Sequence, residues 1–135
     1  INKAISDKIK KIDLFVDINR LSMTSQIPLV DNVKKITVNA TSLDKDVNQK
    51  VGFIKIDVEG HEIEVIEGAI ETINKNKPIL LVEIEERHSK KKVIDAIKFI
   101  NALGYKSYYF NEKELINTAT LTNFETYNNY IFKPI

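Results

Sequence analysis

The chain has 135 residues, of which 43% are hydrophobic, and its 20 basic and 19 acidic side chains give a formal net charge of +1. This size suits one domain with a core of its own, so we expect a single domain over residues 1–135. The small net charge argues against recruitment of nucleic acid or an anionic membrane by the field of the whole chain. The sequence contains no cysteine, which excludes disulfides, a thiol nucleophile and zinc–thiolate sites.

The chain also lacks the sequence marks of membrane insertion and secretion. No apolar run approaches the roughly 20 residues that a membrane-spanning helix needs. No signal peptide is visible, and we therefore expect a cytoplasmic location. The first residue is Ile1 rather than methionine, which fits a processed, trimmed or partial chain.

The first third of the chain carries two segments with strand-like alternation. Hydrophobic and polar residues alternate over residues 12–18 and again over 33–39, which predicts two half-buried strands. The connection over residues 19–32 is irregular. After the second strand, a polar stretch predicts one helical turn capped by Thr41 or Ser42.

The middle of the chain predicts a strand–helix–strand unit. Residues 53–56 are apolar except for Lys55, as in a parallel strand that is covered on both faces. From Glu62 to Ile73, hydrophobic residues recur every three or four positions, which predicts one helix that Pro78 brings to an end. Residues 79–84 form a second buried strand, and such crossovers are almost always right-handed.

The last third predicts another helix and two more strands. The helix has its apolar face between Val93 and Leu103, with Ser89 as a candidate cap and Gly104 at its C-terminal end. Residues 105–110 form the third parallel strand, and residues 127–135 hold the final strand. The stretch between them is expected to be a loop with one helical turn over residues 112–116.

Acidic side chains follow the two strands of the central unit. Asp57 lies at the carboxyl end of the first strand and Glu83 near that of the second. Neighbouring strands lie about 5 Å apart, and ligands of open parallel sheets bind outside the carboxyl ends of the strands. We therefore expect Asp57, Glu59 and Glu83 to share one rim, with His61 and Glu62 at the first turn of the following helix.

Three segments together resemble the FkbM-type methyltransferases: FIKIDVEGHE (53–62), VIEGA (65–69) and PILLVE (78–83). AISD (4–7) and TSLD (41–44) fall in the order that the family shows. The resemblance implies an α/β fold with a Rossmann-like class I methyltransferase sheet, in which the final strand lies antiparallel between the second and third parallel strands. It also implies use of S-adenosylmethionine, usually to methylate a hydroxyl on a sugar, macrolide or similar small molecule. Ala4, Ile5, Ser6 and Asp7 resemble the segment that lies along the adenine.

The sequence departs from the family at the cofactor site. Its four glycines form no G-x-G-x-x-G turn, and the acid that holds the ribose after the second strand of the family is also missing. The chain therefore corresponds to the C-terminal part of the domain, beginning near the third strand. We expect it to be inactive alone, to bind the cofactor poorly, and to self-associate through an exposed sheet edge.

The resemblance implies roles for the rim residues. Asp57 or His61 is the candidate base that takes the hydroxyl proton, while Glu59 and Glu83 orient the small-molecule acceptor. Alternatively, the three carboxylates hold Mg²⁺, which would lower the hydroxyl pKa. Structural roles are also open: Asp57 as a helix cap, Glu59 as a solvated turn residue, His61 as an exposed side chain and Glu83 as the partner of a lysine.

Two other classes of function remain open. One is a different nucleotide-binding enzyme, such as a dehydrogenase, which would need a glycine turn and a following acid upstream of Ile1. The other is a non-catalytic α/β interaction domain derived from such an enzyme. The acceptor itself cannot be identified from the sequence, because specificity lies in loops such as residues 19–32 and 111–123.

Overall fold

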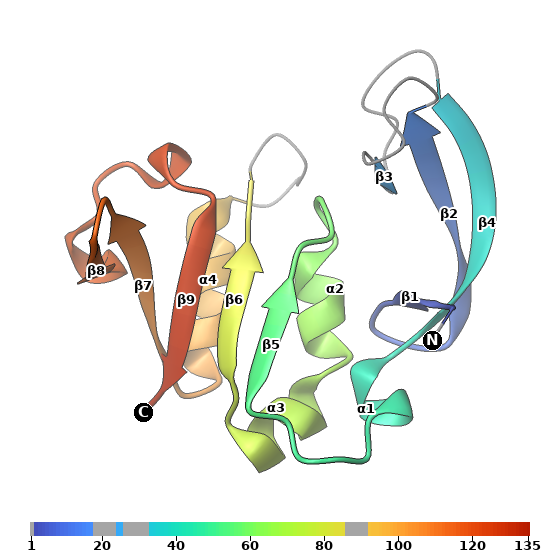
Figure 1. Cartoon of the computed structure of the whole chain (residues 1–135), viewed down its shortest axis with the longest axis horizontal. Helices are drawn as coiled ribbons and strands as arrows, with labels where there is room; N and C mark the ends of the chain where they lie inside the picture. The colour runs from blue at the N-terminus through green and yellow to red at the C-terminus, as the bar shows by residue number, and fades with distance from the viewer. Residues whose placement is uncertain (1, 18–23, 26–32, 86–91) are drawn as a thin grey trace.

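The computed structural model describes residues 2–17, 24–25, 33–85 and 92–135, and these residues contain two β-sheets (Figure 1). The first sheet has the order β1-β4-β2-β3, with bounds β1 (Ala4–Ile5), β2 (Lys10–Asp17), β3 (Thr24–Ser25) and β4 (Val33–Thr41). Strands β2 and β4 are antiparallel along their whole length, and β1 is parallel to β4. Both alternating segments are thus confirmed as strands, as far as the described residues reach.

The second sheet has the order β5-β6-β9-β7-β8. Its strands are β5 (Phe53–Ile56), β6 (Ile79–Glu83), β7 (Tyr105–Asn111), β8 (Glu114–Asn117) and β9 (Asn129–Pro134). Strands β5 and β6 are parallel, and β9 is antiparallel to both β6 and β7. Strand β7 therefore runs in the direction of β5 and β6. This confirms the predicted arrangement, with the last strand inserted antiparallel between the second and third parallel strands.

The helices differ from the prediction in three places. The helices are α1 (Leu43–Asp46), α2 (Glu62–Glu67), α3 (Ile70–Asn76) and α4 (Val93–Ala102), with short 3₁₀ turns η2 (Thr118–Thr120) and η3 (Phe124–Thr126). The continuous helix expected from Glu62 is broken at Gly68 and Ala69. Lys92 occupies the N-cap of α4, and Ser89 lies outside the described residues. The helical turn expected over residues 112–116 is wrong, because this stretch forms the β7–β8 hairpin, whose two-residue turn includes Glu112 at φ 55°.

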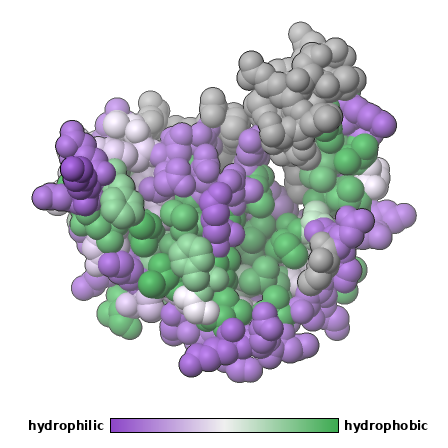
Figure 2. All heavy atoms as spheres, in the orientation of Figure 1, coloured by the Kyte–Doolittle hydropathy of each residue, from purple (hydrophilic) through white to green (hydrophobic). Residues whose placement is uncertain are grey.

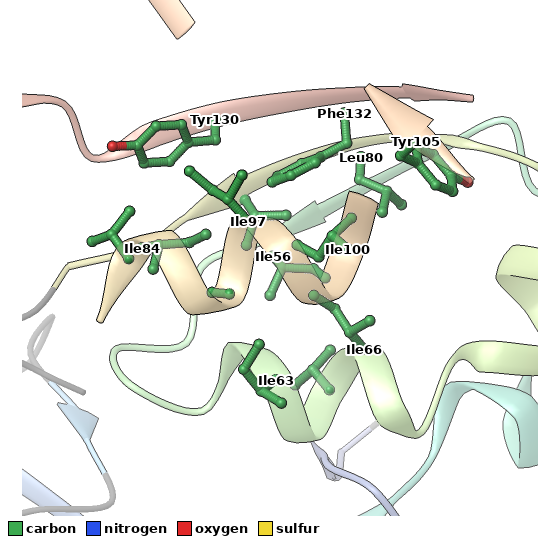
Figure 3. Packing of buried hydrophobic residues seen from close by; sticks show 14 of the residues in the cluster. Ile56, Ile63, Ile66, Leu80, Ile84, Ile97, Ile100, Tyr105, Tyr130 and Phe132 are labelled. Carbon is green, nitrogen blue, oxygen red and sulfur yellow. The ribbon is translucent and has the colours of Figure 1, made fainter. Parts of the chain in front are cut away.

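The hydrophobic core lies between the helices and one face of the five-stranded sheet (Figure 3). Alternate residues of β6 and β9 point into it, with Leu80, Tyr130 and Phe132 fully buried against Ile97 and other residues of α2, α3 and α4. At the edge of this layer, the Tyr105 hydroxyl donates to the Pro78 carbonyl oxygen at 2.9 Å. Burial raises the pKa of that hydroxyl. The helices therefore fix the sheet from one side.

The opposite face of the same sheet is open and partly apolar. Figure 2 shows hydrophobic side chains gathered over the middle of this face, which is turned toward the viewer. Phe53 is 57% exposed, Ile79 is 40% exposed and Phe110 is 52% exposed. Phe53 and Ile79 are paired across β5 and β6, and β5 is a terminal strand of the sheet as the structure describes it. The molecule thus presents both an apolar sheet face and a strand edge.

Within the described ranges, the structure contains no helix that is both long and apolar enough to cross a membrane.

Candidate active site

Two acidic side chains lie together where β5 and β6 end. The register pairs Ile56 with Val82, so Asp57 and Glu83 are the next residues at the same level. Side chains alternate along a strand, which places both carboxylates on the open face, opposite the buried Ile56 and Val82. The Asp57 side chain is 44% exposed, and its Oδ2 lies 2.7 Å from the Lys55 Nζ. The hydrogen bond to Asp57, the charge of Asp57 and then the charge of Glu83 raise the pKa of the Lys55 ammonium.

The turn after Asp57 brings the chain sharply into α2. Glu59 and Gly60 both have positive φ, at 46° and 95°, a conformation in which glycine carries no side-chain penalty. The Gly60 N–H donates to the Oε1 of Glu62 at 2.8 Å, and the Glu62 side chain is almost completely buried. Glu62 thereby holds the turn, and its negative charge in the first turn stabilises the positive end of the helix.

The rim carboxylates do not form a recognisable metal site. In the part of the chain that the structure describes, no group of three or more histidine, aspartate or glutamate side chains is placed to hold a metal ion. Asp57, Glu59 and Glu83 all belong to that part. The three-carboxylate Mg²⁺ site that we considered from the sequence is therefore not supported.

His61 is buried and faces the N-terminal segment. Its side chain is 9% exposed, its Nε2 lies 2.8 Å from the Ser6 Oγ, and its Nδ1 lies 3.6 Å from the Glu64 Oε2. The Ser6 hydroxyl donates its one proton to the Asp7 Oδ1 at 2.8 Å, so the His61 Nε2–H must be the donor to Ser6. His61 thus connects the turn after β5 to the segment after β1, across 55 positions of sequence.

The surroundings of His61 favour its neutral form. Burial lowers the pKa of the imidazole from its usual 6.5, Glu64 opposes this, Lys10 lowers it further, and Asp7 and Glu67 oppose it. The Nε2 is occupied as the donor to Ser6 and the Nδ1 lies beside Glu64, so both ring nitrogens face side chains other than Asp57 and Glu83. The contacts of His61 support a positioning role.

The N-terminal segment is fixed from several sides. The Ser6 N–H donates to the Thr41 carbonyl at 2.8 Å, and Ser6 has no exposed surface. The hydrogen bond from Lys10 and then the one from Ser6 lower the pKa of Asp7 to about 2. Of the four residues that resemble the adenine segment, Ala4 pairs with Ala40 in the sheet and Ser6 is occupied internally. Ile5 pairs with Thr41 and packs partly against the hydrophobic core, and the Asp7 carboxylate accepts from Ser6 and Lys10; both side chains keep part of their surface exposed.

Two residues that fix this site were not recognised as such from the sequence. A Cβ on Gly68 would lie 2.1 Å from the Ser6 carbonyl oxygen, so the absence of a side chain lets α2 approach this segment. Asp44 accepts hydrogen bonds from the N–H groups of Thr72 at 2.7 Å and Glu71 at 3.0 Å, and so caps α3 from another helix. The backbone N–H of Asp44 also donates to the Gly68 carbonyl at 2.9 Å.

Only Gly68 carried a sequence signal for its role. An isolated glycine inside a helical pattern often marks close packing, which is how Gly68 could have been found. Asp44 was noted only as part of the TSLD segment, because a cap supplied from a distant position leaves no local pattern.

The comparisons with known proteins agree with this arrangement. The family model described as the methyltransferase FkbM domain matches residues 4–107, which is most of the chain. A search of curated proteins gave no match. Among solved structures, the chain is similar to the crystal structure of the methyltransferase FkbM from Methylobacillus flagellatus KT, with a TM-score of 0.54 and 15% identity. That match covers 95% of this chain but 26% of the other, so the chain spans about a quarter of that protein's length.

At this identity the structural match supports the fold alone, as a mixed α/β arrangement shared with an FkbM methyltransferase. The family match includes the turn after β5, both acidic rim positions and the segment that His61 contacts. It confirms the resemblance found in the sequence: the chain belongs to the FkbM methyltransferase domain family.

Proposed function

We propose that this chain supplies the acceptor-binding rim of an S-adenosylmethionine-dependent methyltransferase that acts on a hydroxyl of a sugar or another small molecule. The observation that carries the proposal is the pair formed by Asp57 and Glu83. They stand side by side at the carboxyl ends of two parallel strands, on an accessible face, in a domain of a methyltransferase family. This is where open sheets with parallel strands bind their ligands.

The two carboxylates suit different parts of one task. Asp57 accepts the proton of the acceptor hydroxyl, a contribution of about 10²–10⁴-fold to the rate for a well-placed base. Glu83 and Glu59 accept hydrogen bonds from other hydroxyls and so orient the acceptor. Lys55 keeps Asp57 in place through their 2.7 Å ion pair. The cofactor, when bound, supplies an already activated methyl group, so orientation by the protein provides much of the catalysis.

The described residues fit one end of the cofactor. Ile5 and Asp7 would hold its adenosine part, while the bond from the Ser6 N–H to the Thr41 carbonyl and the contact of Ser6 with His61 keep the segment in place. The sequence contains no glycine-rich turn for the rest of the cofactor. We therefore propose that the chain forms one part of a Rossmann-like class I domain and does not bind S-adenosylmethionine alone. The open sheet face and the terminal position of β5 support this proposal.

The test is Asp57→Asn in the complete enzyme, measured as transfer of labelled methyl from S-adenosylmethionine to a panel of hydroxylated sugars. We expect kcat to fall by about 100-fold or more with an unchanged unfolding temperature, because Asn keeps the shape but cannot take a proton. Glu71→Gln, which removes one acidic charge from the exposed surface of α3, is the matched control and should leave kcat unchanged. An Asp57→Asn enzyme that retained full kcat would show that Asp57 is not the base.

A non-catalytic interaction domain is the second candidate, and the open apolar sheet face is the observation that favours it. Calorimetric titration of the complete protein with S-adenosylmethionine separates the two functions. Binding is expected of the methyltransferase, whereas its absence would favour the interaction domain.

A further inference from the structure

The rim formed by Asp57 and Glu83 continues across two further strands. Strand β9 runs antiparallel to β6, so its amino end lies at the edge of the sheet where β5, β6 and β7 have their carboxyl ends (Figure 1). Glu83 pairs with Asn129 in this register. The β7–β9 register continues the row, because it pairs Tyr109 with Tyr130 and so brings Phe110 to the same level. One row across four strands therefore contains Asp57, Glu83, Asn129 and Phe110.

The two added side chains lie on the open face and reach solvent. Their neighbours in sequence, Tyr109 and Tyr130, are buried, and side chains alternate along a strand. Phe110 and Asn129 therefore point to the open side, where Phe110 is 52% exposed and Asn129 is also exposed. Within the part of the chain that the structure describes, no hydrogen bond engages the Asn129 side chain. The amide and the ring are thus accessible to a molecule that occupies the rim.

Contacts beneath the rim hold this end of the sheet together. The Ile84 N–H donates to the Asn128 carbonyl at 2.7 Å, and the Asn128 Nδ2 donates to the Glu85 Oε1, which attach the amino end of β9 to the chain after β6. The rings of Tyr109 and Tyr127 lie 4.4 Å apart between centroids and connect β7 to the segment before β9. The positions of the two added side chains are therefore set by the scaffold, as a specific binding site requires.

The chemistry of the row changes from one end to the other. The carboxylates accept hydrogen bonds from hydroxyl groups, and the Asn129 amide both donates and accepts them. The flat apolar surface of the Phe110 ring suits the apolar face of another ring. Neighbouring strands lie about 4.8 Å apart, so three strand spacings place Phe110 about 14 Å from Asp57 along the row. A single sugar ring is too short to bridge this span.

Given the proposed function, on which this inference rests, we propose that the acceptor is a glycoside with two rings. The ring that carries the reacting hydroxyl lies at Asp57 and Glu83, and the second ring stacks on Phe110. Asn129 binds a hydroxyl between them. Phe110 and Asn129 thus select the acceptor, whereas Asp57 takes part in the reaction.

The test uses the complete enzyme with glucose, galactose and mannose, each as the methyl glycoside, the phenyl glycoside and a methyl disaccharide glycoside. The methyl glycoside has one ring and is the matched control. KM for a two-ring form should be about 3–10-fold lower at similar kcat, because the second ring adds binding that does not change during the reaction. The form that gains shows whether the second ring is aromatic or a sugar, and either gain supports the proposal. Equal KM values for all three forms would overturn it.

Three variants and one control assign the effect to the row. Phe110→Leu keeps an apolar side chain but removes the ring, so KM for the two-ring form should rise to that of the methyl glycoside, whereas Phe110→Trp should retain the preference. Asn129→Ala should raise KM by about 3–10-fold through the loss of a hydrogen bond, with kcat unchanged. Lys113→Ala, in the exposed turn of the same hairpin, should change neither constant. An unchanged preference in Phe110→Leu, at the unfolding temperature of the wild type, would contradict the role of the ring.

Calorimetric titration with the same glycosides, without S-adenosylmethionine, separates this inference from the proposed function. Tighter binding of a two-ring form that Phe110→Leu abolishes supports the inference, even if no methyl group is transferred, a result that counts against the methyltransferase alone. Methyl transfer without any preference for two rings overturns the inference and leaves the proposed function standing. Absence of binding of every two-ring form also overturns the inference.

Discussion

Gly68 is the position at which a single added methyl group should loosen the candidate site. The Cβ of an alanine there would lie 2.1 Å from the Ser6 carbonyl oxygen and 3.0 Å from the Ser42 Cβ. An ordinary contact begins at 3.4 Å, so backbone must move by at least about 1 Å. The movement would disturb the hydrogen bonds of Ser6 to Thr41 and of His61 to Ser6.

The expected magnitude follows from two opposing effects. Overpacking of this kind costs typically about 1–3 kcal/mol. The backbone of Gly68 has φ −77°, which alanine adopts without strain, and a permitted Gly→Ala change stabilises by about 0.4–1 kcal/mol. The contact with Ser6 outweighs the backbone gain, so Gly68→Ala should lower the unfolding free energy by a net of about 0.5–2.5 kcal/mol and the unfolding temperature by roughly 2–12 °C.

The measurement is urea unfolding of Gly68→Ala followed by circular dichroism, together with a thermal scan. Gly52→Ala is the control, because nothing lies within 4 Å of a Cβ built on Gly52 and its φ is not positive. Its unfolding free energy should change by less than about 1 kcal/mol. A Gly68→Ala protein as stable as the wild type, or more stable, would refute the close approach of α2 to the N-terminal segment.

Three further predictions concern the cap, the histidine and the open sheet face. Asp44→Ala should lower the unfolding free energy by about 1–2 kcal/mol, because the Thr72 N–H loses its acceptor. Asp44→Asn, which keeps an acceptor oxygen, should lower it less. Equal urea midpoints for the wild type and both variants would exclude the cap. The folded-state pKa of His61 lies below its usual 6.5, so the unfolded chain binds more protons between these two values. The unfolding free energy should therefore fall as the pH decreases through this window, and it should fall less in His61→Gln. If the unfolding free energies of the wild type and His61→Gln had the same slope against pH between pH 7 and 5, the burial of a neutral imidazole would be contradicted. We also expect the chain alone to self-associate. Phe53 is a 57% exposed residue of the terminal strand, so Phe53→Lys should shift the molar mass measured by light scattering toward that of the monomer. An unchanged molar mass would show that the chains contact each other elsewhere.

Local sequence determined the elements that carry the rim. The apolar run over residues 53–56, the change of period at Glu62 and the stop at Pro78 were sufficient to predict a strand, a helix and a second strand. These patterns work because periodicity reports which side of each element is buried. They also placed Asp57 and Glu83 at strand ends, and the parallel register then brought the two carboxylates together. The position of β9 between β6 and β7 was available only through the family resemblance.

Only the tertiary structure decided how the site is held. His61 and Ser6 are 55 positions apart, and Asp44 caps a helix 28 positions away at Thr72. The break at Gly68 interrupts an apolar pattern that continues without change through both α2 and α3. A periodic pattern reports that a face is buried but not which atoms cover it. The partner of His61, the cap of α3 and the approach to Gly68 therefore depend on how the two sheets and their helices pack, which no local stretch of sequence encodes.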